Sequence, residues 1–123
     1  MLRDQLKKIS MHMLNAVEPR EEMRSAAELT DFFSAWQLDQ FPSFQEKGST
    51  EHVIRSGIAI STVEASHCIT DYLRTTRFIK AVHAALLELM VRFPHQQLRI
   101  LYAGCGPYAT LVVPLLPFFP PSR

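Results

Sequence analysis

Two glycines separated by one residue mark the stretch of this chain that is best suited to hold a ligand. Gly104-Cys105-Gly106 follows an apolar run over residues 98–103 and precedes a second apolar run. A strand, a glycine turn and a helix in this order can bring the backbone close to a nucleotide-like ligand at the end of a parallel strand. The pattern therefore predicts a ligand-binding turn at residues 104–106.

The other reactive side chains carry weaker signals. A catalytic thiol needs a nearby base or positive field, and no histidine lies close to Cys105 in the sequence, so we expect Cys105 to fill space within the turn. Cys68 and Cys105 are the only cysteines, and two cysteines make no disulfide framework, which favours a reducing compartment. None of the five histidines forms a His-x-His or His-x-x-x-His pair, so no metal site is predicted.

The composition is that of a globular protein and excludes several classes of function. The 123 residues are 47% hydrophobic and 20% charged, which suits one domain, or a small domain with part of another. The net charge of +1 and the dispersed basic residues give no indication of a nucleic-acid partner. No apolar run approaches the roughly 20 residues that span a bilayer, and the N-terminus lacks the apolar core of a signal peptide. We therefore expect a cytoplasmic protein without a membrane partner.

The first half of the chain shows helical spacing of its apolar residues. A first helix is expected over residues 3–17, and a second from Pro19, where proline suits the first turn and Glu21 and Glu22 suit its positive end. A loop is expected over 37–49, with Phe41 and Phe44 packing back, and a helical turn over 51–55. The apolar stripe of the second helix is predicted to contain Met23, Ala26, Ala27, Leu29, Phe33 and Trp36.

A long helix is the strongest prediction. Ser61 and Glu64 form a capping box, and apolar residues then recur at steps of three and four up to Phe93, just before Pro94. Such a helix could pack against a sheet, other helices or a second copy of itself. Its predicted inner face consists of Cys68, Tyr72, Thr75, Ile79, Val82, Leu86, Leu89 and Phe93.

The last part of the chain predicts a strand, the glycine turn and a short helix. Residues 98–103 are apolar at most positions, as in a strand that is buried on both faces. A helix is expected to begin near Pro107 or Tyr108, and Pro114 should kink or end it.

The order of these parts resembles the start of a class I S-adenosylmethionine-dependent methyltransferase. In that family a helical region and a leading helix precede a Rossmann-like sheet, whose first strand ends in a loop of the form acidic-x-Gly-x-Gly-x-Gly. Here the loop reads Tyr102-Ala103-Gly104-Cys105-Gly106-Pro107-Tyr108, so the first two glycines match, whereas Tyr102 replaces the acidic residue and Tyr108 the third glycine. The resemblance implies a mainly α chain that ends in the first strand–turn–helix of a truncated Rossmann-like α/β domain. It implies that S-adenosylmethionine is bound by Tyr102, Ala103, Gly104, Cys105, Gly106 and Tyr108.

The same resemblance suggests where the substrate lies. The leading helix of these enzymes often borders the cofactor or substrate pocket, which makes Tyr72, Arg74 and Arg77 candidates for contact with a small-molecule substrate. The alternative is a solvated helix face on which Asp71 pairs with Arg74 or Thr75. No catalytic residue is predicted, because alignment of two bound substrates supplies much of the rate in methyl transfer.

These expectations divide the chain into a helical region over 1–60, the long helix over 61–97, and an incomplete Rossmann-like unit over 98–123. On this interpretation the chain is the N-terminal fragment of a methyltransferase and is inactive alone. A dinucleotide oxidoreductase is a weaker alternative, since Ala109 stands at the third glycine of that fingerprint. The other alternative is a non-enzymatic helical module that forms a homodimer through the long helix or the strand.

Overall fold

The computed structural model describes residues 1–43 and 50–119, and these residues are mainly helical. Helix α1 (Leu2–Asn15) and helix α2 (Pro19–Gln40) pack against each other and confirm the two helices predicted for the first half of the chain. Helix α2 reaches Gln40, so it includes the start of the predicted loop over 37–49. Phe41, which follows it, is exposed, and the prediction for Phe44 lies outside the described residues.

The buried face of α2 is partly polar. Ala26, Leu29 and Phe33 are buried as predicted, whereas Met23 and Trp36 are exposed in part. Glu22 and Gln37 are buried on this face. The face that α2 turns inward therefore carries groups that need polar partners as well as apolar contacts.

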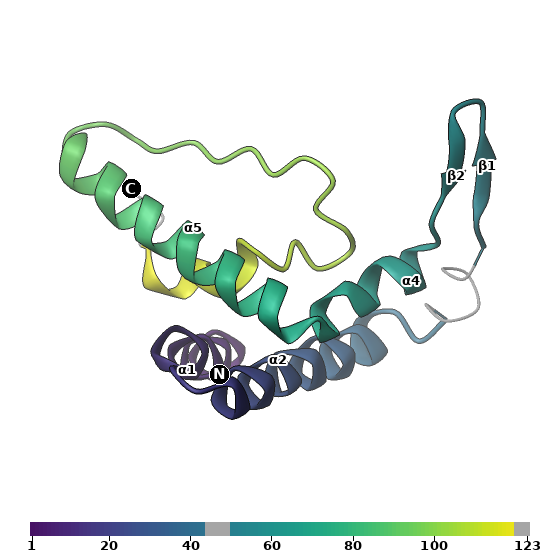
Figure 1. Cartoon of the computed structure of the whole chain (residues 1–123), viewed down its shortest axis with the longest axis horizontal. Coiled ribbons are helices and arrows are strands. Elements are labelled where there is room, and N and C mark those ends of the chain that lie inside the picture. The colour runs from purple at the N-terminus through teal and green to yellow at the C-terminus, as the bar shows by residue number, and fades with distance from the viewer. Residues whose placement is uncertain (44–49, 120–123) are drawn as a thin grey trace.

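A small antiparallel hairpin lies where a helical turn was expected. Strand β1 (His52–Ile54) pairs with strand β2 (Gly57–Ala59), and Val53 stands opposite Ile58. Gly57 has φ of 150°, a conformation that favours glycine and lets the chain reverse directly after Arg55-Ser56. In Figure 1 the hairpin projects away from the helices.

The long helix predicted over 61–93 is interrupted. Helix α4 (Thr62–His67) begins at the predicted cap, where Ser61 accepts a hydrogen bond from the Glu64 amide. It is followed by the 3-10 turn η1 (Cys68–Thr70) and then by helix α5 (Tyr72–Arg92). Asp71 causes the interruption, because its side chain accepts a hydrogen bond from the Arg74 amide and so caps a new helix.

The C-terminal part differs most from the prediction. Residues 98–102 form no strand, because a strand needs a neighbour to pair with and the paired strands of the described chain are β1 and β2 alone. Turns over residues 107–112 lead into the 3-10 helix η2 (Val113–Phe118) in place of the expected α-helix. Pro114 and Pro117 lack the amide hydrogens that an α-helix would use there. A Rossmann-like unit is thus not formed by these residues.

One hydrophobic core holds the molecule together. It includes Met13 of α1, Leu29 of α2, Ile79 of α5 and Leu115 of η2. Helix η2 packs on α1, and in Figure 1 it lies on the α1 side of α5, while the chain over 94–106 runs along the other side. In the part of the chain that the structure describes, no helix has the length and apolar character needed to cross a membrane.

Candidate ligand site at the glycine turn

The glycine turn has a left-handed backbone at both glycines. Gly104 has φ of 65° and Gly106 has φ of 64°, and a side chain in this region would strain the backbone. A Cβ atom added to Gly104 would meet nothing within 4 Å, so the backbone there is open to approach. A Cβ atom added to Gly106 would lie 3.9 Å from the carbonyl oxygen of Ala65, which places the turn against α4.

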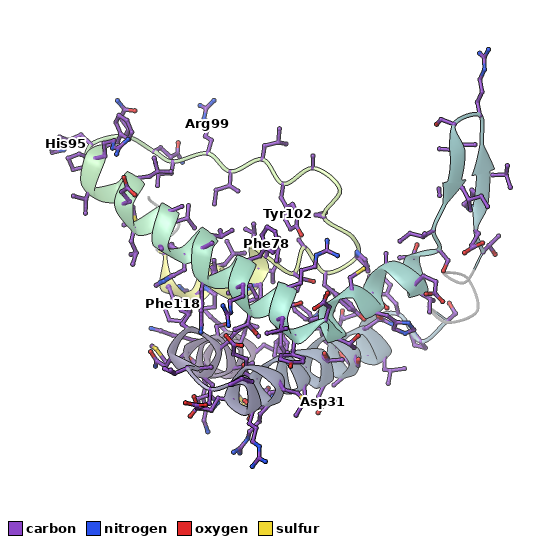
Figure 2. All side chains as sticks on the ribbon, viewed as in Figure 1. Asp31, Phe78, His95, Arg99, Tyr102 and Phe118 are labelled. Atoms are coloured by element: carbon purple, nitrogen blue, oxygen red, sulfur yellow. The ribbon has the colours of Figure 1, made fainter. Side chains whose placement is uncertain are left out.

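Tyr102, which precedes the turn, is influenced electrostatically by residues of three segments. Burial raises the pKa of the Tyr102 phenol, the Cys105 and Cys68 thiols reinforce the rise, and the Arg74 guanidinium opposes it. Each of these effects acts on Tyr102 through charge and extends over distances longer than a hydrogen bond. Figure 2 shows Tyr102 pointing from its segment toward α5, whereas Arg99 points away from it. Arg74 of α5 therefore influences the electrostatic environment of Tyr102, one of the predicted cofactor residues.

The two other substrate candidates have different surroundings. The Nε atom of Arg77 lies 3.0 Å from Oε1 of Glu22, so its guanidinium is held on the side of α5 that faces α2. Tyr72 is half-buried and packs against the hydrophobic core. Arg74 is exposed. Of the three substrate candidates among the described residues, it is the one whose charge influences the pKa of Tyr102.

Tyr108 anchors the end of the turn. Its ring stacks on Phe33 with a centroid distance of 4.8 Å and an interplanar angle of 8°. Its hydroxyl group donates a hydrogen bond to Oε1 of Gln37. Burial raises the pKa of the Tyr108 phenol, and the Ser66 side chain opposes this rise. The residue that replaces the third glycine of the motif thus fastens the turn to α2.

Cys105 was predicted to fill space within the turn, and its side chain makes a local hydrogen bond there. Its thiol donates a hydrogen bond to the Gly106 carbonyl oxygen at 3.3 Å, and the side chain is half-buried. Within the described residues, no group of three histidine, cysteine or acidic side chains is placed to hold a metal ion. The turn itself therefore presents open backbone at Gly104 and the half-buried Cys105 thiol.

Sequence reasoning missed a buried polar cluster between α2 and α5. Glu22 accepts from Arg77 and lies 3.5 Å from Nζ of Lys80, and Lys80 also donates to the Ala16 carbonyl oxygen. Oε2 of Glu22 and Oγ1 of Thr76 are buried and have no partner among the described residues. One sequence signal could have indicated that polar residues are buried on α2. Glu22, Ser25, Leu29, Phe33 and Gln37 recur every three or four residues, which places them on one helix face.

A large apolar cavity has Tyr108 as one of its lining residues. It has a volume of about 940 Å³ and is bounded by the N-terminal turns of α1, the second half of α2, the end of α5 and the chain after residue 98. This volume is at the upper end of the range of about 300–1,000 Å³ that is usual for small-molecule sites. The sequence did not predict the cavity, because its walls come from segments that are distant in the chain.

Comparisons with protein families, curated proteins and solved structures found no match to this chain. The case for a function therefore rests on the residues and their geometry.

Proposed function

We propose that this chain is the N-terminal part of an S-adenosylmethionine-dependent methyltransferase that acts on a small molecule. The supporting observation is the pair of left-handed glycines, Gly104 and Gly106, in a turn that follows Tyr102, whose pKa the Arg74 guanidinium influences. A turn of this kind lets a ligand approach backbone amides without a side chain in the way. We also propose that the chain alone forms an incomplete site, because the sheet expected around such a turn is not formed by the described residues.

The residues at the turn fit one end of the cofactor. Its amino acid portion carries a carboxylate, and Arg74 is an exposed guanidinium that can pair with it. Gly104 leaves open space over the backbone, where the same portion could lie. Tyr102 and Cys105 supply a half-buried phenol and thiol at the edge of this space. When bound, S-adenosylmethionine supplies an electrophilic methyl group, and the task of these residues is to hold and orient it.

Calorimetric titration with S-adenosylhomocysteine tests the proposal. We expect binding to the longest natural form of the protein and weak or no binding to residues 1–123. In the form that binds, Arg74→Ala should weaken affinity about tenfold or more, since a charge-assisted hydrogen bond is lost. Arg99→Ala is the matched control and should bind like the wild type, because Arg99 points away from α5, on which Arg74 lies. Absence of binding to either form would refute the proposal.

A second candidate function is the non-enzymatic helical module. Several large apolar side chains are exposed on α5 and on the segment after it, among them Phe78 at 53%, Val91 at 83% and Leu101 at 93%. Exposed apolar surface of this kind favours association with another protein or a second copy. Leu86, which faces the core and is only 7% exposed, is unsuitable as an interface probe.

The mass of the protein in solution, measured over a range of concentrations, tests this alternative. A dimer that is lost on Val91→Lys or Leu101→Lys would support it. Arg92→Lys, next to Val91 and exposed, is the control. A monomer at all concentrations would exclude a homodimer through these residues.

A further inference from the structure

The 940 Å³ cavity combines an apolar wall with a single charge. Among its lining residues in the described chain, Arg3 is the only one with a charged side chain. The remaining lining side chains are uncharged, and their polar groups are the indole N–H of Trp36, the thioether of Met90 and the hydroxyl of Tyr108, which is already bonded to Gln37. A ligand that fills this cavity must therefore be apolar over most of its length.

Within residues 1–43 and 50–119, Arg3 has no ion-pair partner that a ligand would have to displace. The ion pairs of the described chain do not include it, and the neighbouring Asp4 is paired with the N-terminal amine at 3.1 Å. Because its side chain is exposed at the rim while Leu6 and Phe33 form the interior, the charge lies where solvent can still hydrate it. This arrangement suits a molecule with one anionic end and one apolar end.

We propose that this cavity binds a single-chain carboxylic acid, with its hydrocarbon among Leu6, Phe33 and Leu115 and its carboxylate on Arg3. A guanidinium and a carboxylate form paired hydrogen bonds, so Arg3 would fix the head group. The hydrocarbon would displace water from a wall that offers it few polar partners. This site needs neither the glycine turn nor Arg74, so it stands independently of the proposed methyl transfer.

A second copy of the chain is a poorer occupant of the same surface. In a symmetric dimer the two copies present the same patch to each other. A dimer that covered the cavity would therefore bury the Arg3 guanidinium of each copy, and the lining residues include no carboxylate to pair with it. Burying an unpaired charge opposes association.

Trp36 makes the proposal directly measurable, because it is the only tryptophan in the chain and it lines the cavity. A bromine atom quenches tryptophan emission at short range, so 12-bromododecanoate below its micelle concentration is a suitable probe of the full chain. We expect saturable quenching of Trp36. In competition, each two methylenes added to an unbrominated acid between eight and fourteen carbons should tighten binding about tenfold.

Variants of the head-group residue separate specific binding from general apolar adsorption. Arg3→Gln should weaken binding of the acid about tenfold and leave binding of its methyl ester unchanged. Lys8→Gln, an exposed cation on the same helix outside the cavity wall, should bind both like the wild type. Equal binding of acid and ester by the wild type would overturn the proposal, as would quenching that does not saturate. A Trp36 emission spectrum that shifts with protein concentration, together with a dimeric mass, would assign the surface to a second copy instead.

Discussion

The Nε atom of Arg77 lies 3.0 Å from Oε1 of Glu22, and this contact joins α5 to a residue 55 positions earlier in α2. The Glu22 side chain is only 2% exposed, whereas that of Arg77 is 67% exposed. Lys80 approaches the same carboxylate oxygen at 3.5 Å. A buried carboxylate is thus held by two cations, one of which remains largely in solvent.

We expect the double change Arg77→Met with Lys80→Met to lower the free energy of unfolding by about 3 kcal/mol, because it leaves the Glu22 carboxylate buried without a charged partner. Adding Glu22→Leu should recover much of this loss, since no charge is then buried. Urea unfolding followed by circular dichroism measures both changes. The control is Arg92→Met, whose exposed pair with Glu88 should be worth less than about 1 kcal/mol. A control variant as unstable as the double variant would show that the buried cluster has no special role.

Asp71 caps the start of α5, and replacing it should lower the stability of this helix. Its Oδ1 accepts a hydrogen bond from the Arg74 amide at 3.2 Å. We expect Asp71→Ala to cost about 1 kcal/mol of stability, which is typical for loss of such a cap, and Asp71→Ser to retain most of it. Thermal unfolding of the two variants is the measurement. If the Ser variant is no more stable than the Ala variant, the cap does not stabilise α5.

The sequence predicted those elements whose signals are local. The apolar spacing of Leu6, Ile9 and Met13 indicated α1, and the Ser61 cap indicated the start of α4. The break before α5 was missed because the apolar residues keep the same phase across Asp71, so the periodicity hid a second cap. The strand over 98–103 was wrongly predicted from its composition alone, since a strand also needs a partner and the chain around it supplies none among the described residues.

At the candidate site, too, local features could be predicted from the sequence and long-range contacts could not. Glycine spacing indicated a turn at residues 104–106, and the left-handed conformation found there is one that glycine adopts readily. The pairing of Glu22 with Arg77 and of Tyr108 with Gln37 could not be predicted, since each joins residues that are far apart in the chain. Long-range polar contacts depend on how the helices pack, and no local pattern encodes that.

Tyr108 should stabilise the fold through its hydroxyl group as well as its ring. The change Tyr108→Phe keeps the stacking on Phe33 but leaves Oε1 of the buried Gln37 without its donor. We expect a loss of about 1–3 kcal/mol in the free energy of unfolding, the usual penalty for an unpaired buried group. A second change, Gln37→Leu, should recover part of the loss in the Phe background. If Tyr108→Phe alone is neutral, the hydroxyl group contributes nothing to holding the turn.

The two phenols near the turn should make stability depend on alkaline pH. Burial raises the pKa values of Tyr102 and Tyr108 above the ordinary 10.0 in the folded protein, while the unfolded chain titrates at the ordinary value. Above that value the unfolded chain loses these protons first, so it binds fewer protons than the folded chain and the free energy of unfolding falls as pH rises. The stabilisation from the two protonated phenols is therefore complete below pH 10 and is lost through the raised folded-state values. Urea unfolding between pH 9 and about 11, compared with the variant Tyr102→Phe with Tyr108→Phe, isolates this effect from the lysines. The variant should show the shallower decline with pH, and identical slopes would mean that the two phenols titrate alike in the folded and unfolded chains.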